Sequence, residues 1–114
     1  SRPAPPLLGA SARNVPVDAA ILEALQNGQE RKTIADLEAL VISFVMDPSR
    51  NQLEFPSTLG PYPKMLAHRV AQAYGLHTQT VDFEDGPGRV VGRRTHDTHK
   101  RAVTLMALDV SPAA

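Results

Sequence analysis

Lys64 and His68 are the two residues of this chain whose types and spacing best suit a defined chemistry. They lie four positions apart in residues 61–76, a stretch predicted to be helical, so both side chains project from one helix face. A cation and a titratable imidazole near a helix start are suited to holding a phosphate, because the first helical N–H groups are unpaired and the N-terminus is partially positive. We therefore take nucleic-acid binding as the hypothesis to test.

His68 also predicts that binding depends on pH. Protonation of its imidazole near the reference pKa of about 6.5 would add a second positive charge toward a phosphate. Binding is therefore expected to be tighter at about pH 6 than at about pH 8.

The formal net charge of the whole chain is zero, so it does not by itself attract nucleic acid. Its 114 residues include 12 Lys and Arg against 12 Asp and Glu, so a cationic surface must come from local clustering. Residues 88–101 are such a cluster, with Asp97 as their acidic residue. Its basic residues are Arg89, Arg93, Arg94, Lys100 and Arg101. Asp82, Glu84 and Asp85 come just before it, which indicates either a polarised surface or a solvated hairpin.

Composition also excludes certain kinds of site and of protein. The chain has no cysteine, which rules out disulfides and thiolate zinc sites and suits an intracellular location, nuclear or cytoplasmic. No apolar run approaches the roughly 18 residues of a membrane span, and no cleavable signal peptide is visible, so no membrane partner is expected. Because the sequence opens on Ser-Arg without methionine, we expect a piece of a larger multidomain chain. We expect the domain itself to be monomeric.

Apolar spacing predicts two helices before the segment of Lys64 and His68. The first covers residues 17–27, with Asp18 in its first turn and Gly28 as its C-terminal cap. The second covers residues 34–46, with Thr33 as its N-cap. It is expected to end at the following Asp-Pro pair, because a residue before proline is pushed out of the helical region.

The third predicted helix begins at its prolines and is closed by Gly75. Its apolar stripe, which should face a sheet, consists of Tyr62, Leu66, Val70 and Ala73. Lys64, His68 and Gln72 lie opposite the stripe or at its flank, so a phosphate could reach them.

Strand patterns complete the expected fold. Residues 51–55 alternate as a short strand, and residues 77–83 and 89–95 flank the turn signal at 84–88 as a hairpin. Residues 103–110 form an apolar run that suits a further strand or a short helix. Short strands joined by tight turns, and helices with one apolar stripe each, favour an antiparallel sheet covered on one face by helices, which is an α+β fold.

The domain organisation follows from composition. Residues 1–15 are rich in Pro and Ala and lack apolar periodicity, so we expect a flexible linker. Residues 16–110 are expected to form a single domain with its core in residues 34–98, and residues 111–114 to be a tail.

The order of these motifs resembles the R-three-H domain family, which is named for an Arg-x-x-x-His motif and is associated with single-stranded nucleic acids. The matching motifs are Leu53-Glu54-Phe55-Pro56, Tyr62-x-Lys64-x-x-x-His68, Ala71-x-x-Tyr74-Gly75-Leu76, Thr80-Val81-Asp82 and Arg89-Val90-Val91. With Arg94-Thr95-x-x-Thr98 they look like the branch whose members are RNA-associated. Lys64 stands where the family has its arginine, which keeps the charge but loses the planar, bidentate geometry of guanidinium.

The resemblance implies both a fold and a function. The implied fold is a three-stranded antiparallel sheet with two helices packed on one face, to which residues 17–27 and 103–110 are additions. The implied function is an accessory module that binds single-stranded RNA or DNA through backbone phosphates without reading base sequence. The nucleic-acid-binding residues that it implies are Lys64, His68, Tyr62, Arg69, Arg89, Arg93 and Arg94.

Other functions have weaker support in the sequence. His96-Asp97-x-His99 could offer three metal ligands, but on a loop without cysteine it is expected to be a polar connection, so no metal or cofactor is predicted. No Ser/His/Asp pattern, phosphate loop or dinucleotide fingerprint is present, so no enzyme is predicted. The alternative is a protein–protein interaction module with little nucleic-acid affinity, suggested by the zero net charge, acidic residues 82–85 and apolar residues 103–110.

Overall fold

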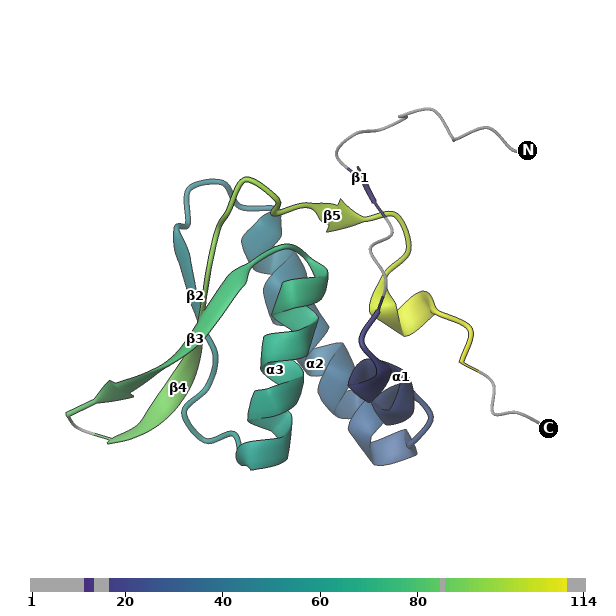
Figure 1. The fold of residues 1–114 in the computed structure, drawn as a ribbon, viewed down its shortest axis with the longest axis horizontal. Coiled ribbons are helices and arrows are strands. Elements are labelled where there is room, and N and C mark those ends of the chain that lie inside the picture. Colours follow the sequence, from purple (N-terminus) through teal and green to yellow (C-terminus); the bar gives the residue numbers. More distant parts are fainter. Residues whose placement is uncertain (1–11, 14–16, 85, 111–114) are drawn as a thin grey trace.

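The structure is a computed structural model that describes residues 12–13, 17–84 and 86–110. In chain order the elements are β1 (Ala12–Arg13), α1 (Ala19–Leu25), α2 (Gly28–Val45), β2 (Gln52–Glu54), α3 (Pro61–Ala73), β3 (His77–Phe83), β4 (Gly86–Arg93), β5 (Lys100–Arg101) and the 3-10 helix η1 (Leu105–Ala107). The β3–β4 hairpin projects away from the helices (Figure 1). Within these ranges, no helix has the length and apolar character needed to cross a membrane.

Side-chain caps set the starts of the first two helices. Asp18 begins α1, and its carboxylate accepts the N–H group two residues later at 2.8 Å. Asn27 begins α2, and its side-chain oxygen accepts the N–H groups two and three residues later, both at 3.1 Å. The prediction that α2 starts at residue 34 with Thr33 as N-cap was therefore wrong. Gly28 is the first residue of α2 and not the cap of α1.

The main sheet has the strand order β2-β4-β3, and both of its pairings are antiparallel. Leu53 and Thr78 both pair with Gly92, and Thr80 pairs with Val90. Paired residues of antiparallel strands point to the same face. Because Leu53 and Val90 are buried, these rows face the helices. The predicted α+β fold, with a three-stranded antiparallel sheet and helices packed on it, is confirmed.

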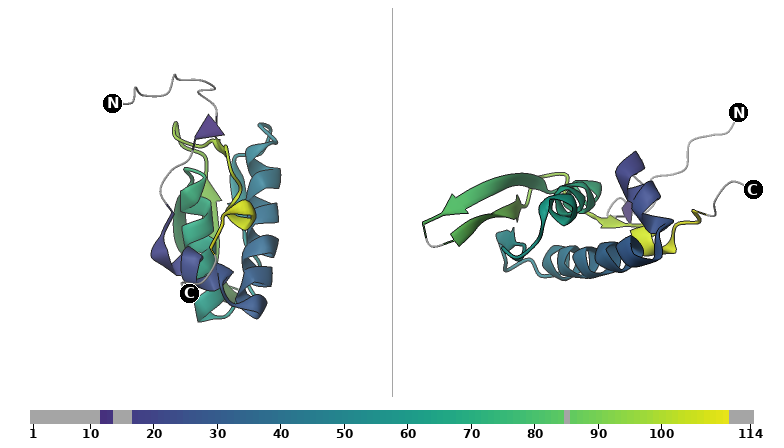
Figure 2. Two further views of the ribbon diagram at one scale, coloured as in Figure 1. Left: turned by 90° about the vertical axis from the view of Figure 1, so that its right-hand side faces the viewer. Right: turned by 90° about the horizontal axis from the view of Figure 1, so that it is seen from below.

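The core lies between the sheet and the helices, and α1 packs against both longer helices (Figure 2). The largest fully buried side chains are Tyr74, Phe44, Phe55, Ile21, Ile34, Leu66 and Leu105. Ile21 comes from α1 and Leu105 from η1, so both additions to the expected core contribute to one apolar interior.

A short strand lies inside the predicted linker. Ala12–Arg13, inside the predicted linker, pairs in parallel with Lys100–Arg101. The remaining residues of that linker, like the predicted tail 111–114, lie outside the described residues. The apolar run 103–110 contains η1, which is the helical of its two predicted alternatives.

Candidate nucleic-acid interface

Lys64, His68 and Gln72 form one line along α3, at successive turns of the helix. The buried residues of the helix are Leu66, Ala67, Val70, Ala71 and Ala73, so the polar line lies beside the core-facing stripe. Lys64 and His68 are half-buried and Gln72 is exposed. The chain turns at Gly75 and returns as β3, which packs against α3 (Figure 1).

Tyr62 does not belong to the apolar stripe in which the sequence predicted it. Its side chain is 40% exposed, and its hydroxyl donates to Glu30 Oε1 of α2 at 3.2 Å. Partial burial and this hydrogen bond raise the pKa of Tyr62. The tyrosine therefore joins the start of α3 to the start of α2 across the surface.

The start of α3 offers fewer backbone donors than a helix N-terminal phosphate site requires. Pro61 and Pro63 have no N–H group, and the N–H of Lys64 donates to the Gly60 carbonyl at 3.0 Å. A phosphate bound here would depend on side chains.

The side chain of His68 lies against two threonines of β3. Its Nδ1 is 2.8 Å from Thr78 Oγ1 and its Nε2 is 3.3 Å from Thr80 Oγ1. Gln72 Nε2 also donates to Thr78 Oγ1 at 3.3 Å. The two threonines are alternate residues of one strand, so their side chains share the face toward α3. Both ring nitrogens of His68 are therefore engaged by hydroxyl groups.

The surroundings of His68 favour its neutral form. Partial burial, and after it the positive charge of Arg69, lower its pKa below the ordinary value. Any charge that His68 adds toward a phosphate would thus appear at lower pH than the sequence suggested.

The predicted cationic residues around this pair do not converge on one surface. Arg69 pairs with Asp18 of α1 at 3.8 Å. Arg89 pairs with Glu54 at 3.1 Å. Arg89 and Arg93 alternate with Val90 and Gly92, which face the helices, so they lie on the other face of the sheet. Arg93 is exposed there.

The side chain of Arg94 binds backbone carbonyls around the end of α2. Its Nη2 donates to the carbonyls of Phe44 and Asp47, both at 2.6 Å, and its Nε to that of Arg50 at 2.9 Å. Its guanidinium also lies 4.4 Å from the centroid of the Phe44 ring. Cations near a helix C-terminus satisfy unpaired carbonyls and oppose the negative end of the helix dipole. We therefore leave Arg94 out of the interface proposed below.

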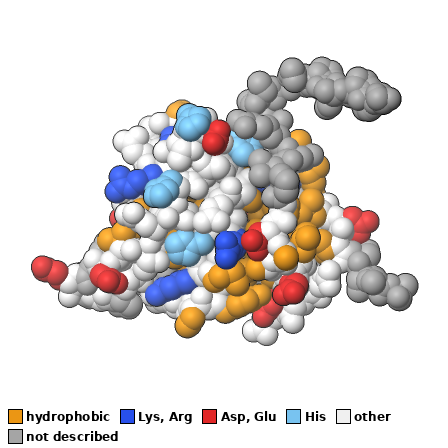
Figure 3. Space-filling model, viewed as in Figure 1, with side chains coloured by type: hydrophobic (Ala, Val, Ile, Leu, Met, Phe, Trp, Pro, Cys, Tyr) orange, Lys and Arg blue, Asp and Glu red, His pale blue; other side chains and the backbone are white. Residues whose placement is uncertain are grey.

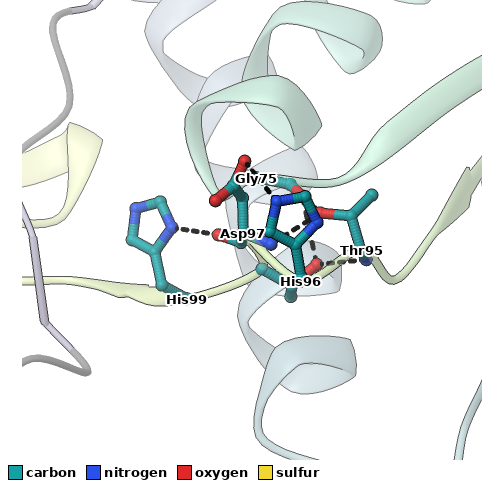
Figure 4. A network of polar contacts seen from close by, with 6 residues as sticks. Gly75, Thr95, His96, Asp97 and His99 are labelled. Atoms are coloured by element: carbon teal, nitrogen blue, oxygen red, sulfur yellow. Dashed lines mark hydrogen bonds and ion pairs between the residues drawn. The ribbon is translucent and has the colours of Figure 1, made fainter.

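A second polar network fixes the turn between α3 and β3 (Figure 4). The Gly75 carbonyl accepts the hydroxyls of Thr95 at 2.7 Å and Thr98 at 3.1 Å. Gly75 has φ +79°, and a Cβ there would lie 2.1 Å from the Asp97 carbonyl oxygen. Only glycine fits this close approach. The loop after β4 thereby sets the direction in which β3 leaves α3.

The histidines of the 96–99 motif take part in that loop. His96 Nε2 lies 3.7 Å from the Asp97 carboxylate, and His99 Nδ1 donates to the Asp97 carbonyl at 2.6 Å (Figure 4). His99 is buried, whereas His96 is exposed. In the part of the chain that the structure describes, no three His, Cys, Asp or Glu side chains are placed to hold a metal ion.

Sequence reasoning missed the two threonine hydroxyls that contact the His68 ring. Thr78 and Thr80 are ordinary strand residues, and nothing in their spacing shows that a histidine of the preceding helix faces them. Their spacing at i and i+2 indicates only that the two hydroxyls share one face of the strand.

On the face shown in Figure 3, histidine and basic side chains lie over α3 and β3, and acidic side chains lie both at the hairpin end and over the helices. No curated protein matches the chain. The family model of the R-three-H domain matches residues 32–91, a little over half of the chain. This is the family that the ordered motifs resembled, a family of nucleic-acid-binding and not catalytic domains. The chain therefore belongs to the R-three-H domain family.

Proposed function

We propose that this domain binds single-stranded RNA or DNA through backbone phosphates at the junction of α3 and β3. The observation that carries the proposal is the line of Lys64 and His68 on α3 beside the hydroxyls of Thr78 and Thr80. A cation and hydrogen-bonding groups on one accessible junction suit a phosphate, which is shared by every nucleotide. Membership in a nucleic-acid-binding family supports the same reading.

The proposed contact is small, so the domain acts as an accessory module. Arg69 and Arg89 are paired with carboxylates, and Arg89 and Arg93 lie on the other sheet face. These three arginines therefore attract the nucleic acid at long range and make few direct contacts at the junction. With about two phosphates engaged, log affinity should fall with log salt at a slope of about −1 to −2. In this proposal the domain is a monomeric part of a larger intracellular protein, nuclear or cytoplasmic, that contains other binding elements.

An oligonucleotide titration followed by backbone amide shifts tests the proposal. Short single strands of RNA and DNA should shift the amides of Lys64, His68 and Thr80, and added salt should reverse the shifts. Lys64→Ala should weaken binding about fivefold, whereas Lys64→Arg should strengthen it about twofold because guanidinium binds phosphate with paired donors.

Lys32→Ala is the matched control, because Lys32 lies on α2 and pairs there with Asp36 at 3.4 Å. It removes the same charge but should leave the affinity within about twofold of wild type. Absence of shifts at millimolar oligonucleotide, or equal losses in the two alanine variants, would contradict the proposal. The alternative, a protein–protein interaction module, rested partly on the apolar run 103–110. That support is weaker because Leu105 of this run is buried.

A further inference from the structure

The hydrogen bonds around His68 connect four side chains in sequence. Gln72 donates to Thr78, Thr78 contacts one nitrogen of the His68 ring, and the other nitrogen contacts Thr80. Thr78 is half-buried and Thr80 is exposed, so the connected groups run from the side of the helix toward solvent. Thr80 is their outermost member.

The number of protons on these groups limits how they can be arranged. A neutral imidazole has one N–H donor and one acceptor nitrogen. If Nδ1 accepts the Thr78 hydroxyl, then Nε2–H donates to Thr80 Oγ1 and the Thr80 hydroxyl proton is free. In the opposite tautomer Nδ1–H donates to Thr78 Oγ1, and Nε2 accepts the hydrogen bond of the Thr80 hydroxyl. The Thr78 hydroxyl proton is then the one available to another acceptor. The first arrangement leaves its free donor on the exposed threonine.

We propose that His68 is a neutral positioning residue, and that the Thr80 hydroxyl, which it orients, donates to the bound phosphate while Lys64 supplies the positive charge. This inference rests on the proposed function and assigns its hydrogen-bond donor. All donors then point the same way, from Gln72 through Thr78 and His68 to Thr80. Such a chain polarises each successive group, so the terminal hydroxyl becomes a stronger donor to an anion.

A direct contact between the His68 ring and the phosphate is the competing arrangement. It would require the ring to give up one of its threonine hydroxyls. The two arrangements differ in their dependence on pH, because direct contact favours the imidazolium whereas positioning needs only the neutral ring. The other charged or titratable groups on the two elements beside the ring are Tyr62, Lys64, Arg69, His77 and Asp82. Because β3 carries a second imidazole, that of His77, the state of the His68 ring must be observed directly.

Substitutions at Thr80 test the donor. An oligo-uridylate single strand is titrated at about pH 8, where the imidazole is neutral. Thr80→Val, which keeps the shape and strand preference of the residue, should weaken binding about fivefold. Thr80→Ser, which keeps the hydroxyl, should stay within about twofold of wild type. Ser43→Ala removes a hydroxyl from an exposed position of α2 and should change nothing.

The tautomer and pH profile of His68 test its role. Nitrogen NMR of the ring in the complex should show hydrogen on Nε2 and none on Nδ1. Affinity should stay flat from about pH 8 to about pH 6.5. The inference is overturned if Thr80→Val binds as wild type does, or if affinity rises in step with protonation of the His68 ring. If Lys64→Ala also leaves binding unchanged, the proposed function fails as well, so the two failures are distinguishable.

Discussion

At the scale of single residues, Gly75 has both a backbone conformation and a close contact that favour glycine. Its φ of +79° is rare for side-chain-bearing residues, and an added Cβ would lie 2.1 Å from a backbone oxygen of the 95–98 loop. Gly75→Ala should lower the free energy of unfolding by about 3 kcal/mol, measured by urea denaturation. The reason is that neither the turn at Gly75 nor the 95–98 loop can move away easily.

Gly28→Ala is the control for that substitution. Nothing lies within 4 Å of a Cβ at Gly28, which is the first residue of α2. Alanine there should be neutral or stabilise by up to about 1 kcal/mol. Equal stability of the two variants would show that the turn does not depend on glycine.

The same residue scale shows why the side chains of the proposed interface were only partly predictable. Lys64 and His68 could be identified because helical spacing places them together from local sequence alone. Thr78 and Thr80 could not, since their role depends on how β3 returns along α3, which is a tertiary relation. The role of Arg94 at the end of α2 could not be predicted either, because a run of basic residues does not show which side chain turns inward.

At the scale of elements, Arg93 and Arg94 are neighbours with opposite expected roles. Arg93 is exposed on the open sheet face, whereas Arg94 binds three carbonyls around the end of α2. Arg94→Ala should cost about 2–3 kcal/mol in urea unfolding, because half-buried carbonyls lose three hydrogen bonds from a charged donor. Arg93→Ala should leave stability within about 0.5 kcal/mol of wild type.

Nucleic-acid titration separates the two arginines further. Arg93→Ala should weaken binding about twofold and reduce its salt dependence. Arg94→Ala, measured under conditions where it stays folded, should bind as wild type does. If folded Arg94→Ala lost affinity and Arg93→Ala did not, Arg94 and not Arg93 would contact the nucleic acid.

Element boundaries show where sequence patterns stop being informative. The apolar repeat of α2 becomes clear only from Ile34, but the helix begins at Gly28 because Asn27 caps it. Residues 28–33 are polar and carry no apolar period, so only the cap marks the start. The pairing of Ala12–Arg13 with Lys100–Arg101 is too short to leave any pattern.

At the scale of the whole molecule, segments outside the family match are built into the same core. The match covers residues 32–91, whereas α1 and η1 lie outside it. Arg31 links both to α2, since it donates to the carbonyls of Leu25 at 3.3 Å and Met106 at 3.0 Å. Segments that precede and follow the family match in the sequence therefore both pack into its core.

Glu38 of α2 is the main attachment of the C-terminal extension. Its buried carboxylate accepts the Tyr74 hydroxyl at 2.6 Å and the N–H groups of Leu105 at 2.6 Å and Met106 at 3.1 Å. Burial, and after it the hydrogen bond to Glu38, raise the pKa of Tyr74, so the tyrosine remains a donor at ordinary pH. One carboxylate thus joins α2, the end of α3 and the start of η1.

Glu38→Gln tests this attachment with little change of shape. An amide has one acceptor oxygen, so its NH₂ group must face a donor, and at least one buried N–H or O–H loses its partner. The substitution should cost about 2–3 kcal/mol, whereas Tyr74→Phe, which leaves both backbone N–H groups bound, should cost about 1 kcal/mol. Amide hydrogen exchange distinguishes local from global loss: Glu38→Gln should accelerate exchange at Leu105 and Met106 well before exchange at Val90. Unchanged protection at those two amides would mean that apolar burial of Leu105, and not the carboxylate, holds the extension in place.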